Sequence, residues 1–143
     1  MATEYVIYSD ESASFGVVFS NFYGGALIRS SHLDKVRQLL AAKKAELNLY
    51  GEVKWQKVTA NYLEKYRELM DLFFDLIDED IIKVRIMFTQ NLYIPLNLTD
   101  EQKEHAYFLL YYQFIKHAFG LIHSNPGNTT IWVRLLIDQM PHP

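Results

Sequence analysis

Apolar residues near the start of the chain form short runs that predict β-strands. Runs rich in β-branched and aromatic residues predict strands at residues 5–9, 15–19 and 23–28, with a turn at residues 20–22. Because the links between these runs are short, we expect an antiparallel three-strand meander. Gly24 and Gly25 stand where the third strand begins, a position at which glycine favours a bulge or a close approach of two backbones.

Helical spacing of apolar residues dominates the middle of the chain. Ser30 or Ser31 is expected to cap a first helix, in which Leu33, Val36, Leu40 and Leu47 recur at helical intervals. The charged residues of this helix lie mostly on its other face, which we interpret as solvated. Thr59 is expected to open a second helix, whose predicted buried stripe consists of Leu63, Tyr66, Met70, Phe73 and Ile77.

The last third of the chain predicts a strand, a long helix and a further strand. Alternating apolar residues predict a strand at residues 81–89. Thr99 and Gln102 fit a capping box that opens the longest helix, which we expect to end near His123. An apolar run predicts the last strand at residues 131–137. This strand–helix–strand order predicts a right-handed parallel crossover, and hence a mixed α/β fold.

Length and composition restrict the class of protein. The 143 residues suit a single domain, residues 1–143, and half of them are hydrophobic, which is enough to form a core. A net charge of −3 argues against a broad basic DNA-binding surface, although acidic metal sites also make this value more negative. The absence of cysteine excludes disulfides, thiolate zinc sites and cysteine nucleophiles. We see neither a signal peptide nor a membrane span, and expect a cytoplasmic protein.

Three acidic residues are candidates for a metal site. Asp10 follows the first predicted strand and Asp138 follows the last, so parallel pairing of these strands would bring both carboxylates to the same end of the sheet. Clustered carboxylates repel each other unless a cation neutralises them, and hard oxygen ligands select Mg²⁺ or Mn²⁺. Two such ions promote phosphodiester hydrolysis. The alternative is that these acids only end strands, as Asp favours turns.

Glu52 is the third candidate acid, and it lies on a short segment after the first helix. If residues 52–55 are extended, Glu52 and Lys54 point to one side while Val53 and Trp55 point to the other and anchor the segment to the core. Lys54 could then steady a phosphate as a point charge. The alternative is a surface ion pair between Glu52 and Lys54.

Three motifs together resemble a mainly prokaryotic and phage family, catalogued as domain of unknown function 3800. The motifs are a strand ending in Asp10-Glu11-Ser12, a strand containing Gly24-Gly25, and the pair Glu52 and Lys54. The resemblance implies a ribonuclease-H-like fold and a metal-dependent nuclease that acts on DNA or RNA, with links to mobile elements or phage defence. It implies that Asp10, Glu52 and Asp138 are metal ligands, and that Glu11, Ser12 and Lys54 support them.

The chain departs from this family at its C-terminal end. Family members usually continue into a further helix that carries another acid, whereas this sequence stops at Pro143. We therefore expect a truncated ribonuclease-H-like domain, in which a second copy or a partner chain covers the C-terminal side. The competing hypothesis is a catalytically inactive relative that acts as a protein- or nucleic-acid-binding module.

Overall fold

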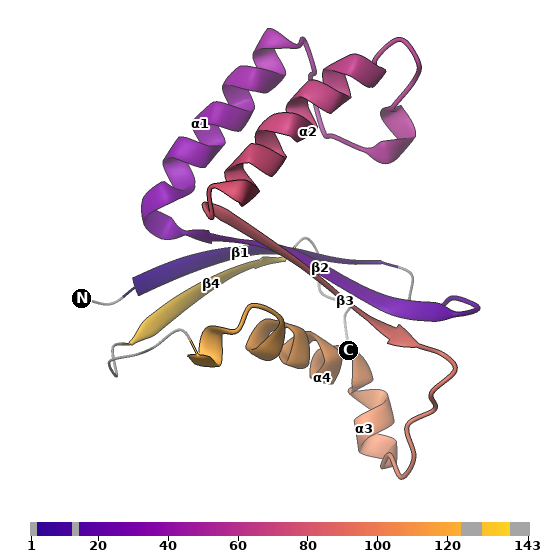
Figure 1. Cartoon of the computed structure of the whole chain (residues 1–143). Coiled ribbons are helices and arrows are strands. Elements are labelled where there is room, and N and C mark those ends of the chain that lie inside the picture. Colours follow the sequence, from indigo (N-terminus) through magenta and orange to yellow (C-terminus); the bar gives the residue numbers. More distant parts are fainter. Residues whose placement is uncertain (1–2, 13–14, 124–129, 138–143) are drawn as a thin grey trace. The chain divides into compact units, whose positions relative to one another are not determined.

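The computed structural model describes residues 3–12, 15–123 and 130–137, and it shows an α/β protein. A four-stranded mixed sheet has the strand order β3-β2-β1-β4. Two compact units are formed, one by residues 1–27 and 83–143 and the other by residues 28–82. The first contains most of the sheet and the later helices, and the second contains the first two helices (Figure 1).

The strands are β1 (Thr3–Ser12), β2 (Phe19–Arg29), β3 (Ile82–Gln90) and β4 (Ile131–Ile137). The α-helices are α1 (Ser30–Glu46), α2 (Leu63–Asp78), α3 (Asp100–Glu104) and α4 (Ala106–Gln113). Shorter turns are the 3₁₀ helices η1 (Trp55–Lys57) and η3 (Leu121–His123), and the π-helical turn η2 (Phe114–Ala118).

β1 lies inside the sheet, as its apolar run predicts. Val6 and Ile7 are both fully buried, although they face opposite sides of the strand. β1 pairs with β4 in parallel, in a register that runs from Thr3 opposite Ile131 to Ser9 opposite Ile137. The condition under which Asp10 and Asp138 would lie at the same end of the sheet, parallel pairing of the first and last strands, is therefore met. β1 continues to Ser12, so Asp10 lies within the strand and not beyond its end.

The predicted division of residues 15–28 into two strands is wrong. A single strand, β2, begins at Phe19 and passes through the expected turn. The polar residues that suggested a turn are instead held by the neighbouring strand. The Ser20 hydroxyl donates to Asn91 Oδ1 at 2.6 Å, and Asn21 Nδ2 donates to Thr89 Oγ1 at 2.9 Å. Asn21 has a φ of 52°, the left-handed conformation that asparagine tolerates well.

The expected close approach at the glycine pair is confirmed at Gly25. A Cβ atom added there would lie 3.2 Å from the Tyr8 carbonyl oxygen and 3.3 Å from the ring of Phe114. The absence of a side chain at Gly25 thus lets the backbone of β1 and an aromatic ring from the helical layer pack directly on β2.

α4 and η2 pack on one face of the sheet (Figure 1). The buried cluster there consists of Tyr23, Tyr111 and Phe114, and it includes Leu135 and Ile137 of β4 at its border. Leu110 and Ala118, which stand four residues before and after Phe114, pack against this cluster, whereas Ile122, a further four residues along, is half exposed. The capping box of Thr99 and Gln102 is also present.

The single long helix predicted for residues 100–123 is wrong. This segment is divided at His105, between α3 and α4, and it changes to a π-helical turn at Phe114. Ile115 of this turn and Phe119, which follows it, both pack against the same buried cluster.

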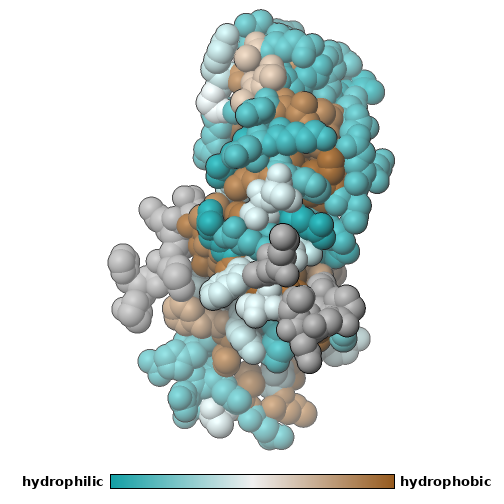
Figure 2. Space-filling view, turned by 90° about the vertical axis from the view of Figure 1, so that its left-hand side faces the viewer, coloured by the Kyte–Doolittle hydropathy of each residue, from teal (hydrophilic) through white to brown (hydrophobic). Residues whose placement is uncertain are grey.

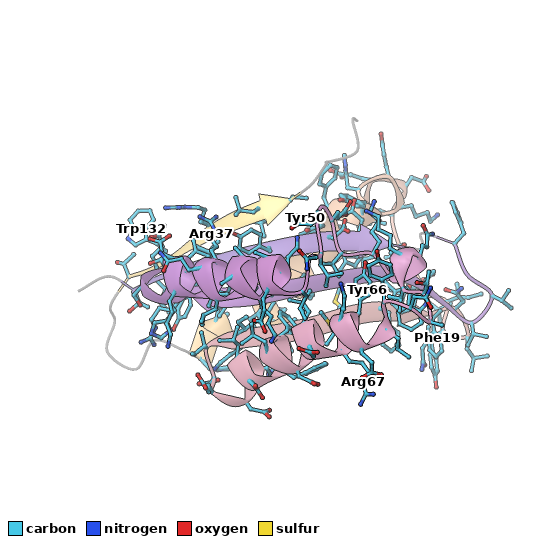
Figure 3. All side chains as sticks on the ribbon, turned by 90° about the horizontal axis from the view of Figure 1, so that it is seen from above. Phe19, Arg37, Tyr50, Tyr66, Arg67 and Trp132 are labelled. Atoms are coloured by element: carbon cyan, nitrogen blue, oxygen red, sulfur yellow. The ribbon has the colours of Figure 1, made fainter. Side chains whose placement is uncertain are left out.

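In the second unit, Leu69 of α2 packs against Leu47 and Leu49, which follow the end of α1, and Leu40 of α1 borders this cluster. Tyr66 borders this cluster and lies between the two helices, whereas Arg67 projects from the outer side of α2 (Figure 3). The outer surface of this unit, at the top of Figure 2, is mostly hydrophilic with apolar patches between.

Three predictions for these helices are wrong. Neither Ser30 nor Ser31 caps α1, whose N-cap is Arg29, and α2 begins at Leu63 instead of Thr59. The buried residues of α2 are Leu69 and Leu76, so the apolar stripe is rotated from the predicted one. Leu63 and Met70 are more than a third exposed.

No helix within the described ranges is long and apolar enough to cross a membrane.

Candidate functional site at the carboxyl end of β1

The candidate site begins where β1 and β4 run side by side. Their register places Ser9 opposite Ile137, which are the residues that directly precede Asp10 and Asp138 in the sequence. Asp138 itself lies outside the described residues, so its predicted role as a metal ligand stays a prediction. β1, which carries Asp10, and β4, which directly precedes Asp138 in the sequence, are nevertheless adjacent and parallel, as the predicted carboxylate pair requires.

Asp10 is exposed, and its carboxylate has a defined local orientation. Its Oδ1 atom accepts a hydrogen bond from the backbone N–H of Glu11 at 2.9 Å. The second carboxylate oxygen has no hydrogen-bond partner among residues 3–12, 15–123 and 130–137. Asp10 therefore presents an oxygen ligand that is available to a cation or to a hydrogen-bond donor.

A pocket of about 500 Å³ adjoins Asp10. Its walls are residues 8–10 of β1, the Gly24-Gly25 pair of β2, and Leu136 and Ile137 of β4. Within the pocket, the buried Ser9 hydroxyl donates to the Gly24 carbonyl oxygen at 2.8 Å, which satisfies both groups. The carboxylate of Asp10 is the only charged group among the lining residues that the structure describes, so this pocket carries negative charge.

Glu11 faces the opposite side of β1, near the tyrosines Tyr23, Tyr107 and Tyr111. The pKa of the Tyr107 hydroxyl is raised, first by burial and then by the nearby Glu11 carboxylate. Burial also raises the pKa of Tyr111, with Glu11 and Asp10 adding to the shift and the Ser9 hydroxyl opposing it. The pKa of the Tyr23 hydroxyl is raised in the same way, first by burial and then by the Glu11 carboxylate.

This tyrosine cluster is tightly packed. The ring centroids of Tyr23 and Tyr111 are 5.2 Å apart, and those of Tyr107 and Tyr111 are 5.8 Å apart. The buried hydroxyls of Tyr107 and Tyr111 make no well-formed hydrogen bond within the described part of the chain. The four-residue spacing of Tyr107 and Tyr111 predicts that they share a helix face, but only the fold brings Tyr23 and Glu11 to that face.

Glu52 and Lys54 belong to the second unit, so the structure does not relate them to Asp10. They are presented together, as predicted, with Lys54 Nζ 2.9 Å from Glu52 Oε2. The hydrogen bond from Lys54 holds the pKa of the Glu52 carboxyl below its usual value. The expectation that Val53 and Trp55 anchor the segment is wrong, because Trp55 is 87% exposed and begins the 3₁₀ turn η1.

Among the described residues, no group of three or more His, Cys, Asp or Glu side chains is arranged to hold a metal ion. Asp10 supplies one oxygen ligand at the pocket, and Ser12 is exposed at the end of β1. The remaining ligands that a Mg²⁺ or Mn²⁺ site would need come, by prediction, from Asp138 and Glu52.

Comparison with protein-family models, with curated proteins and with solved structures finds no match to this chain. The resemblance to domain of unknown function 3800 therefore rests on the motifs at residues 10–12, 24–25 and 52–54 alone.

Proposed function

We propose that this protein is a ribonuclease-H-like, metal-dependent nuclease that hydrolyses phosphodiester bonds of DNA or RNA. The observation that carries the proposal is the parallel pairing of β1 and β4, with Ser9 opposite Ile137 next to a pocket that Asp10 lines. A rigid sheet edge of this kind holds a carboxylate firmly while leaving it open to a ligand.

In this proposal, Asp10, Glu52 and Asp138 hold Mg²⁺ or Mn²⁺, which supplies water activation and stabilisation of the leaving oxygen. Lys54 neutralises part of the charge of the nucleic-acid backbone. Ser12 supports the site from the end of β1. Glu11 supports it indirectly, because its contact with the Tyr107 side chain on the other face of β1 helps to fix the direction of the strand at Asp10.

Cleavage assays with Asp10→Asn test the proposal. Labelled single- and double-stranded DNA and RNA are incubated with the protein and Mn²⁺ or Mg²⁺, with EDTA as the negative condition. Asparagine keeps an oxygen that can accept the Glu11 N–H, so the fold at β1 should persist while the charge is lost. We expect activity to fall at least a hundredfold, as for the loss of a group that stabilises the transition state.

Asp71→Asn is the matched control, because Asp71 is an exposed acid on α2, outside the candidate site. A metal-dependent activity that survives in Asp10→Asn, or that falls equally in Asp71→Asn, would contradict the assignment of Asp10.

A non-catalytic binding module is the second candidate, and exposed apolar side chains at one end of the sheet favour it. Phe15 and Val17 precede β2, while Leu92 and Leu96 follow β3, and all four are more than 80% exposed. The two loops lie side by side, because the Asn91 N–H donates to the Val18 carbonyl at 2.9 Å. Exposed apolar patches of this kind mark interaction surfaces.

A thermal melt with millimolar Mn²⁺ against EDTA separates the two functions. A ligand that binds only the folded state raises the melting temperature, so a metal site gives a rise that Asp10→Asn abolishes. The absence of any shift at millimolar metal would favour the binding module.

A further inference from the structure

A second pocket, of about 600 Å³, opens in the first unit between the end of β3, the following loop and α4. Its volume lies in the range of small-molecule sites. Unlike the pocket beside Asp10, it has no charged side chain among its described lining residues. Apolar side chains of the loop and of α4 form much of its wall, and amide side chains form the rest together with Thr89 and Tyr93. Such a lining favours an uncharged ligand with an apolar body and polar edges.

One wall of this pocket is held rigid by hydrogen bonds between β2 and β3. The Ser20 hydroxyl is buried and donates to Asn91 Oδ1, while the Thr89 hydroxyl donates to the Ser20 carbonyl oxygen at 3.0 Å. Asn21 Nδ2 donates to Thr89 Oγ1 at 2.9 Å. This network uses the nitrogen of the Asn21 amide and fixes its plane, but leaves its oxygen without a hydrogen-bond partner in the described part of the chain.

Gln102, which also lines this pocket, offers a complementary group. Gln102 Oε1 accepts the backbone N–H of Thr99 at 3.0 Å in the capping box of α3. This bond orients the side chain and leaves the Gln102 Nε2 donor without a partner among the described residues. The pocket thus presents a fixed acceptor, from Asn21, and a fixed donor, from Gln102.

An aromatic ring completes the lining. Tyr93 lies on the loop after β3 and is 72% exposed, so its ring is available to a ligand. Its backbone N–H donates to the Gln90 carbonyl oxygen at 3.2 Å, which holds the loop in a turn next to the rigid wall.

We propose that this pocket binds an uncharged nucleobase, which stacks on Tyr93 and is read by the Asn21 and Gln102 amides. Nucleobases combine flat apolar faces with donors and acceptors at their edges, and proteins recognise unpaired bases by aromatic stacking and amide hydrogen bonds. The base can belong to a free nucleoside or to a single strand. This inference concerns base binding and needs neither metal nor cleavage, so it goes beyond the proposed nuclease function.

NMR titration of the ¹⁵N-labelled protein in EDTA tests the inference. The probes are adenosine, cytidine, guanosine and uridine, a single-stranded DNA hexamer, and an abasic hexamer of the same charge. We expect at least one nucleoside or the hexamer to shift the side-chain amides of Asn21 and Gln102, and the abasic hexamer to leave them unchanged. Binding of nucleosides would identify a site for free bases, and binding of the hexamer alone would identify a site for a base on a strand.

Variants at Tyr93 separate stacking from general packing. Tyr93→Leu keeps apolar bulk without the ring and should weaken binding about five- to a hundredfold, the range expected for one base–aromatic stack. Tyr93→Phe should bind within about threefold of the original protein, because the ring face remains. The control is Tyr112→Leu, a change at an exposed α4 tyrosine that does not line the pocket.

Three outcomes would overturn the inference. They are equal binding of the intact and the abasic hexamer, equal affinity in Tyr93→Leu and the original protein, and the absence of shifts at Asn21 and Gln102 with every probe. Because the titration is made without divalent metal, none of these outcomes bears on the cleavage assay at Asp10.

Discussion

Phe114 should contribute more to stability than any exposed phenylalanine of the chain. The change in the free energy of unfolding caused by Phe114→Ala measures this contribution. Its side chain is fully buried, and its ring packs against Tyr23, Tyr111 and Phe119 with centroid distances of 6.4, 6.4 and 5.5 Å. Alanine would leave a cavity under the glycine pair of β2, where neighbouring groups cannot easily collapse. Buried Phe→Ala changes cost about 3–5 kcal/mol in the free energy of unfolding.

The unfolding entropy converts this cost into a melting temperature. At about 2 cal/mol/K per residue, the whole chain has an unfolding entropy near 0.3 kcal/mol/K, so the melting temperature should fall by about 10–17 °C. Circular dichroism during heating measures the melting temperature, and urea titration measures the free energy of unfolding. Phe15→Ala is the matched control, because it removes the same atoms from a side chain that is 94% exposed.

We expect the control to change the free energy of unfolding by less than about 0.5 kcal/mol. If Phe114→Ala costs less than about 1 kcal/mol, or if the two variants are equally destabilised, the aromatic cluster on this face of the sheet does not form the core of the first unit.

Two further predictions concern titratable groups. The raised pKa of Tyr111 means that the folded state keeps this proton more firmly than the unfolded state does, so its contribution to stability is present below pH 10 and is lost as the pH rises further. Urea titrations from pH 8 to pH 11 should therefore show a smaller alkaline loss of stability in Tyr111→Phe than in the original protein, and an equal loss would refute this. At neutral pH we expect Tyr111→Phe to be at least as stable as the original protein, because it lacks a buried unpaired hydroxyl. Lys54→Met should raise the pKa of the Glu52 carboxyl towards its ordinary value, which NMR titration of the carboxyl carbon measures. Lys57→Met should raise this pKa less, because the Lys54 hydrogen bond is the main cause of the shift.

Much of the sheet could be predicted because burial leaves a plain mark on the sequence. The runs around Val6 and Ile7 and at residues 131–137 are both strands, as their apolar composition predicts. Only the first of them is buried, because Val6 and Ile7 are inaccessible whereas Trp132 of β4 is 63% exposed. The run at residues 15–19 has the same composition but is almost entirely exposed, with Val17 at 97%. Local composition cannot distinguish these cases, because burial depends on which strand lies alongside.

Polar residues misled the prediction where their partners are distant in sequence. Ser20 and Asn21 are typical turn residues, yet here they lie near the start of a strand and hydrogen-bond to Thr89 and Asn91 at the end of the neighbouring strand. In the candidate site, too, local sequence patterns could be predicted and contacts between distant residues could not. Asp10 was identified from its place after an apolar strand, whereas the contact between Glu11 and Tyr107 depends on packing across almost a hundred residues.

The parallel pairing of β1 with β4 also has a consequence for how the chain folds during synthesis. Thr3 pairs with Ile131, so one edge of the first strand has no partner until nearly every described residue has left the ribosome. Pairings of such high sequence separation form slowly, because the entropy of closing a long loop must be overcome first. In the meantime the nascent chain exposes an apolar strand edge, which makes this stage the one most vulnerable to aggregation and most dependent on chaperones.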